Sequence, residues 1–114
     1  MQTSTSNHVE LPAPIAGYFA ADTTDGNAVA RCFSEGAVVV DERREYRGRA
    51  AIARWKAEAT TKYRYTSEPI SAEVSGKHVT VTARLTGEFP GSPIELRYRF
   101  VLEGNEIARL EIAS

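Results

Sequence analysis

The chain is poor in the residues that build disulfides and metal sites. Its 114 residues include one cysteine, Cys32, and two histidines, His8 and His78. A single cysteine cannot form an internal disulfide, and these side chains show none of the spacings at which Cys and His hold a metal. The sequence therefore predicts no metal and no cofactor, and a fold that does not need an oxidising compartment.

The sequence also lacks a charge excess and long apolar runs. It has 14 basic and 15 acidic residues, a net charge of -1, so charge alone attracts neither nucleic acid nor an anionic membrane. No apolar run reaches the length of about 20 residues that a membrane helix needs. The N-terminus, MQTSTSNHVE, lacks the basic and apolar regions of a signal peptide. We expect a cytoplasmic protein with no nucleic-acid or membrane partner.

The first half of the chain has helical patterns. Residues 1–11 are polar and predict a flexible N-terminal arm, and residues 12–114 are predicted to form a single domain. Pro12 and Pro14 suit the start of a helix whose one face carries Tyr18 and Phe19. A second helix is predicted after Asn27, with Gly36 at its end, and a third from Arg49 to about Thr60.

The second half of the chain has strand patterns. Residues 37–41 predict a first strand, 42–47 a charged turn or short hairpin, and 63–74, 77–89, 94–103 and the residues after Asn105 four further strands. Apolar residues alternate with polar ones, and the last strand is predicted to turn Ala108, Leu110 and Ile112 inward. Helices followed by such strands indicate an α+β fold, with one strongly curved antiparallel sheet wrapped around three helices.

One stretch, FSEGAVVVD…YRGRAAIARW, carries a family resemblance. With the order of elements over residues 12–113, it resembles the SnoaL-like branch of the nuclear transport factor 2-like superfamily, which is related to polyketide cyclases and ketosteroid isomerases. The resemblance implies a cone-shaped barrel whose sheet is mixed at its start. Members commonly dimerise through the outer sheet face, so it implies a homodimer here, built on Thr80, Thr82, Arg84, Thr86, Arg97 and Arg99.

The resemblance also implies a site. Ketosteroid isomerases use a strand-end Asp as the base, a helix Tyr as a hydrogen-bond donor to the developing oxyanion, and a second acid on a later strand. Asp41 and Tyr18 match the first two positions, whereas Tyr98 stands where the second acid is expected. Asp41, Tyr18 and Tyr98 are the candidate catalytic residues. The candidate pocket walls are Phe19, Trp55, Val81, Phe100 and Leu110.

Two interpretations of these residues stay open. In the first, Asp41 is a desolvated base acting on a small apolar carbonyl compound, in an isomerase, cyclase or dehydratase type of reaction. In the second, Asp41 is ionised and paired with Arg43, Arg44 or Arg47, the tyrosines are core aromatics, and the protein is a non-catalytic ligand-binding or dimeric association module.

Overall fold

Three helices precede most of the sheet in the chain. The computed structural model describes residues 9–22, 24–62 and 64–114, so most of the predicted N-terminal arm lies outside the described residues. The elements are α1 (Ala13–Ala21), α2 (Gly26–Ala30), β1 (Phe33–Asp41), β2 (Arg44–Arg47), α3 (Arg49–Lys62), β3 (Tyr65–Ser75), β4 (His78–Gly87), β5 (Ile94–Glu103) and β6 (Glu106–Ala113). No helix in this described part of the chain is long and apolar enough to cross a membrane.

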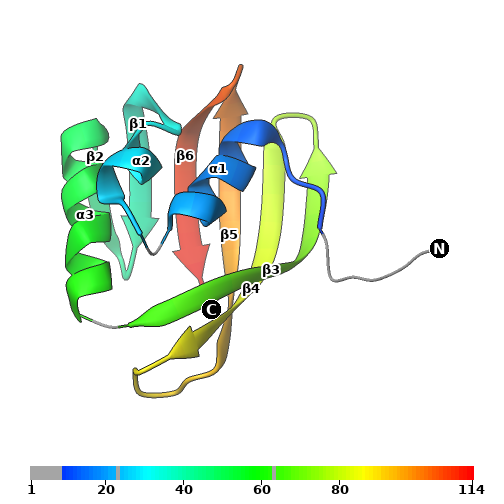
Figure 1. The fold of residues 1–114 in the computed structure, drawn as a ribbon. Helices are drawn as coiled ribbons and strands as arrows, with labels where there is room; N and C mark the ends of the chain where they lie inside the picture. Colours follow the sequence, from blue (N-terminus) through cyan, green and yellow to red (C-terminus); the bar gives the residue numbers. More distant parts are fainter. Residues whose placement is uncertain (1–8, 23, 63) are drawn as a thin grey trace.

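The strands form a mixed sheet of six strands in the order β2-β1-β6-β5-β4-β3. Only the β1–β6 pair is parallel, and all the other neighbours are antiparallel. The sheet is curled but not closed, and the helices lie on one face of it (Figure 1). Helix α3 packs against β1 and β2, and α1 packs against β3 and β6. The predicted α+β fold with one strongly curved sheet is confirmed.

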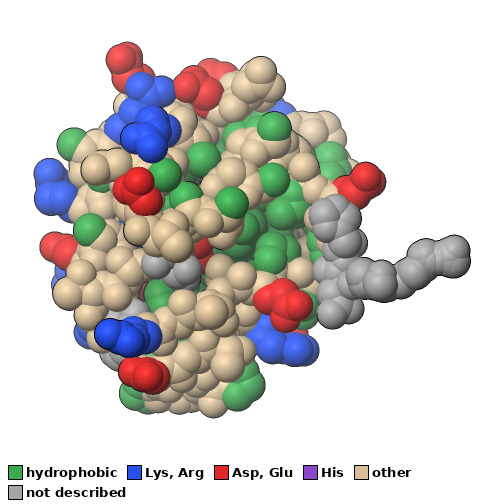
Figure 2. Space-filling model, viewed as in Figure 1, with side chains coloured by type: hydrophobic (Ala, Val, Ile, Leu, Met, Phe, Trp, Pro, Cys, Tyr) green, Lys and Arg blue, Asp and Glu red, His purple; other side chains and the backbone are tan. Residues whose placement is uncertain are grey.

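The core lies between the helices and the concave face of the sheet. Alternation along β4 and β5 turns Val79, Val81 and Ala83, and Tyr98 and Phe100, toward the helices. Valine and phenylalanine side chains contribute about 1.5–3 kcal/mol each when fully buried. Figure 2 shows hydrophobic side chains gathered beside α1 on the helix-bearing face, with charged side chains around its margin. Apolar burial of one sheet face therefore holds the helices in place.

Two predicted boundaries are wrong, and both errors come from strand pairing. The second helix was expected to run to Gly36, but α2 ends at Ala30 and β1 already begins at Phe33. Phe33 pairs with Ile107 of β6, and the register shifts before Val38, which lets Gly36 lie inside the strand. Pairing with a distant strand outweighed the local helical spacing of this segment.

At the start of β6, the residue that faces the core also differs from the prediction. Ile107 is fully buried where Ala108 was expected, while Leu110 faces inward as predicted. The pairing of β5 with β6 shifts by one residue between Val101 and Leu102. A shift of one residue exchanges the two faces of a strand, so simple alternation fails up to that point.

Candidate functional site

Strand β1 ends on Asp41, where the chain turns back into β2. Asp41 pairs with Arg44 across the hairpin, so the turn consists of Glu42 and Arg43. Both residues have positive φ angles, 53° and 66°. Tight hairpins favour this backbone, but they usually place Asn and Gly there because other residues are strained in it. A strained turn directly after an acidic strand end marks this edge of the sheet as a candidate site.

The strain at Arg43 can be tested by stability measurements. Arg43→Gly is expected to raise the free energy of unfolding by about 1 kcal/mol, because glycine adopts positive φ without a Cβ clash. Urea denaturation of the variant and the wild type checks this. The matched control is Arg97→Gly within β5, which should lose stability, since glycine weakens a strand. A less stable Arg43→Gly protein would show that the arginine side chain stabilises the fold by more than the strain of its positive φ destabilises it.

The carboxylate of Asp41 is held by an aromatic residue of α3. The indole Nε1–H of Trp55 donates a hydrogen bond to Oδ2 of Asp41, with 3.0 Å between the heavy atoms. Burial raises the pKa of Asp41 above its ordinary value, and the bond from Trp55 opposes this only in part. Asp41 takes part in none of the ion pairs found among the described residues, and Arg47 pairs with Glu45 instead.

The raised pKa of Asp41 makes a prediction about stability. The folded state binds this proton more tightly than the unfolded chain, so its contribution is present below the ordinary carboxyl range and is lost as the pH rises through the folded-state pKa. Asp41→Asn removes this loss. We expect the variant to melt at a higher temperature than the wild type at neutral pH, and the two to converge in acid. Glu35 is an exposed acid of the same strand, so Glu35→Gln is the control. Its melting temperature should match that of the wild type at both pH values.

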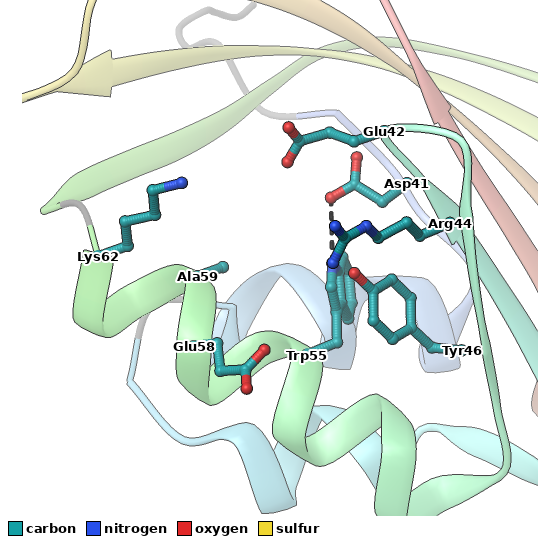
Figure 3. Close-up of a pocket in the computed structure, with 8 residues that line it drawn as sticks. All are labelled: Asp41, Glu42, Arg44, Tyr46, Trp55, Glu58, Ala59 and Lys62. Carbon is teal, nitrogen blue, oxygen red and sulfur yellow. Dashed lines mark hydrogen bonds between the residues drawn. The ribbon is translucent and has the colours of Figure 1, made fainter.

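A pocket opens beside Asp41, between the β1–β2 hairpin and α3. Its volume is about 390 Å³, and Figure 3 shows its walls. The rings of Tyr46 and Trp55 lie 6.0 Å apart between centroids, at an angle of 34°, and supply its apolar surface. The remaining lining residues are Asp41, Glu42, Arg44, Glu58, Ala59 and Lys62. The pocket thus combines a half-buried carboxylate, two aromatic rings and a rim of both charges.

Tyr18 and Tyr98 lie deeper than this pocket. Tyr18 is 0% exposed and Tyr98 is 2% exposed, and their ring centroids are 6.1 Å apart. Burial raises the pKa of both hydroxyls well above the ordinary tyrosine value, so both are neutral donors at physiological pH. Among the described residues, no hydrogen bond joins either hydroxyl to Asp41, although the Asp41 charge contributes to both shifts. The structure brings the two tyrosines together, and neither lines the pocket beside Asp41.

The predicted pocket walls are divided between the pocket beside Asp41 and the hydrophobic core. Trp55 lines the pocket beside Asp41. Val81, Phe100 and Leu110 are buried in the hydrophobic core, and Phe19 packs against that core with its ring 5.1 Å from the ring of Tyr98. Phe19 and Phe100 therefore lie against the tyrosine rings, and none of these four side chains lines the pocket beside Asp41.

A buried ion pair lies next to both Tyr18 and Trp55, and little in the sequence indicated it. Nζ of Lys56 forms a salt bridge and hydrogen bond with Oδ1 of Asp22, and both side chains are under 5% exposed. Nζ also lies 3.4 Å from the hydroxyl oxygen of Tyr18 and 3.3 Å from that of Tyr65. Ser67 donates to Oδ2 of Asp22 at 2.6 Å. Asp22 shares its helix face with Tyr18, which was the one available signal, whereas nothing in the Ala-rich helix singled out Lys56.

Metal-binding side chains are scattered in the part of the chain that the structure describes. No group of three or more His, Cys, Asp or Glu residues gathers there. Cys32 is half-buried, and burial raises the pKa of its thiol, which disfavours the reactive thiolate. A half-buried carboxylate with a raised pKa, such as that of Asp41, is chemically suited to accept a proton.

The curled mixed sheet and the helices on its concave face define a class of protein. They are the features of the nuclear transport factor 2-like α+β fold, to which ketosteroid isomerase-like proteins also belong. A profile of the SnoaL-like domain matches residues 16–109. The chain belongs to the SnoaL-like family, as the sequence resemblance implied.

Solved structures agree with this assignment. A Sinorhizobium meliloti protein, provisionally named a polyketide cyclase, is 41% identical, with a TM-score of 0.85 over 90% of this chain and 94% of its own. A Catenulispora acidiphila protein with a ketosteroid isomerase-like fold, solved with trimethylamine, is 25% identical, with a TM-score of 0.82 over 92% of this chain and 87% of its own. Among curated proteins, none matches the chain.

Proposed function

We propose that this SnoaL-like protein catalyses cofactor-free proton transfer on a small carbonyl compound, with Asp41 as the base. The observation that carries the proposal is the half-buried carboxylate of Asp41, whose pKa is raised by burial and which lines a pocket of about 390 Å³. A raised pKa brings a carboxylate closer to the basicity that proton abstraction from carbon requires at neutral pH. The provisional name of the Sinorhizobium relative, polyketide cyclase, supports a carbonyl ligand.

The proposed step needs only residues of this chain. Ionised Asp41 takes a proton from the carbon next to the carbonyl, and the electron pair of that C–H bond moves to form an enolate. Returning the proton to a different atom completes an isomerisation. In a cyclisation the enolate carbon instead attacks a second carbonyl of the same compound, and the proton held by Asp41 passes to the resulting alkoxide, which regenerates the base. The Trp55 N–H holds one carboxylate oxygen and so sets the direction of attack.

The enolate oxygen needs donors. Tyr46 and Arg44 line the same pocket as Asp41, and both side chains can donate a hydrogen bond to the enolate oxygen. Tyr18 and Tyr98 can act as donors only for a ligand that reaches into the core, because both are buried. The facing rings of Tyr46 and Trp55 favour a ligand with a flat apolar part.

Deuterium exchange tests this proposal without knowledge of the natural substrate. The protein is incubated in D₂O with ketones that carry a flat apolar group, such as 2-tetralone and phenylacetone, and exchange next to the carbonyl is followed by NMR. Exchange above background that Asp41→Asn abolishes and Glu35→Gln retains is the expected result. Ketones that bind the pocket without exchange would instead favour the alternative, a non-catalytic ligand-binding module.

We also propose that the protein forms a homodimer through the outer sheet face. Arg84, Arg97 and Arg99 are exposed there, and Thr80 and Thr82 are half-buried beside them. A face of threonines and arginines can pair with a second copy across strands. Sedimentation should give about twice the chain mass of 12.5 kDa; a value equal to the chain mass would reject the dimer.

A further inference from the structure

Trp55 lies between a negative and a positive group. Its indole N–H donates to Asp41 at 3.0 Å, and Nζ of Lys56 lies 4.3 Å from the centroid of its ring. A cation over an aromatic face is attracted by the electron density of the ring. The ring is therefore held at its N–H edge by the candidate base and at its face by a buried ammonium group.

This contact is not expected from the helix alone. Trp55 and Lys56 are adjacent in α3, and adjacent helix positions point in different directions. Lys56 is turned toward the end of α1 by Asp22, which forms a buried salt bridge with it. Tyr18 and Tyr65 lie within hydrogen-bond distance of the same ammonium group. Residues from α1 and β3 thus determine where the charge of Lys56 sits.

We propose that Lys56 is a positioning residue for Asp41: anchored by Asp22, its ammonium group holds the Trp55 ring so that the indole N–H is directed at the Asp41 carboxylate. This inference deepens the proposed function, and rests on it for the role of Asp41 as the base. A cation over the ring also withdraws electron density from the indole, which makes its N–H a stronger donor. The chain of contacts runs from Asp22 through Lys56 and Trp55 to Asp41.

The charges around this chain of contacts come from several elements. Around Lys56 they are Asp22, with the neutral hydroxyls of Tyr18 and Tyr65. Around Asp41 the pocket contributes Glu42, Arg44, Tyr46, Glu58 and Lys62. The positive charge of Lys56 lowers the pKa of Asp41, which opposes the effect of burial. Removing that charge should therefore raise the pKa of Asp41 further.

The single tryptophan allows a direct test, because Trp55 gives the only indole N–H signal in the spectrum of ¹⁵N-labelled protein. The main variant is Asp22→Asn/Lys56→Met, which removes both buried charges and leaves neither without its partner. Lys56→Arg keeps the cation. Arg54→Met, an exposed residue of the same helix, removes an equal charge away from the ring. Hydrogen exchange of the indole N–H and its chemical shift against pH are recorded for each protein.

We expect the indole N–H to exchange about tenfold faster in the double variant, because that variant loses a desolvated cation–π contact. The pH midpoint of the indole shift should move upward in that variant. Lys56→Arg should stay close to the wild type, and so should Arg54→Met. If the double variant does not fold, Asp22→Asn/Lys56→Gln provides the test, since it removes the same two charges, keeps an amide that can hydrogen-bond in place of the ammonium group, and should also accelerate exchange.

Several results would overturn the positioning role. An unchanged indole signal in the folded double variant would leave Lys56 with a purely structural role. Equal shifts in Arg54→Met and in the double variant would show a general charge effect, and a Lys56→Arg protein that behaves like the double variant would show that the cation is not the agent. No substrate is used, so failure here is distinct from failure of the deuterium-exchange assay, which tests Asp41 as the base.

Discussion

Asp41→Asn is expected to lower the rate of carbonyl-assisted proton exchange by about 10²- to 10⁴-fold, the usual contribution of a positioned general base. An asparagine at this position has nearly the same shape, and its amide oxygen can still accept the N–H of Trp55. The loss would therefore reflect missing basicity and not a displaced side chain. Rates of deuterium incorporation into a ketone of the panel, compared between wild type and variant, measure the effect.

The pH dependence of the same assay identifies the group that titrates. The wild-type rate should rise with pH as Asp41 ionises, with a midpoint above the ordinary aspartate range, because burial raises the pKa of Asp41. Glu35→Gln should retain both the rate and the midpoint, since Glu35 is exposed on the same strand. An Asp41→Asn protein with wild-type exchange rates would remove Asp41 from the mechanism.

Lys56→Met alone is expected to reduce the free energy of unfolding by about 3–5 kcal/mol, a large share of the about 5–15 kcal/mol that holds a typical domain folded. The substitution leaves Asp22 buried, at 1% exposure, with no counter-ion. The remaining hydrogen bond from Ser67 cannot replace the lost charge. Urea denaturation of the variant and the wild type gives the difference.

The double variant Asp22→Asn/Lys56→Met is the matched control for this loss. It should recover most of the stability, because a buried pair replaced by uncharged groups of similar size leaves no charge without a partner. Arg54→Met, on the exposed side of α3, should change stability little. Equal losses in the single and double variants would mean that the packing of the lysine stem, and not the unpaired Asp22, dominates.

Local patterns determined most of the fold. Alternation along β4 and β5 predicted which side chains are buried, because a strand has a strict two-residue period. The stretch around Asp41 predicted a strand end, a charged hairpin and a helix after Gly48, and all three are present. Gly48 has a φ of 84°, which few other residues adopt, so this one glycine predicts the junction between β2 and α3.

Contacts between distant segments decided the rest. The start of β1 at Phe33 and the inward position of Ile107 depend on the pairing of β1, β5 and β6, which no local window contains. The Trp55–Asp41 bond and the Lys56–Asp22 pair depend on how α1, α3 and β1 pack. The sequence by itself determined the element types and an acid at the end of the first strand, because these follow from local periodicity and turn chemistry. Only the tertiary structure decided the partners of that acid and of the buried lysine, because those contacts exist only once separate elements are packed together.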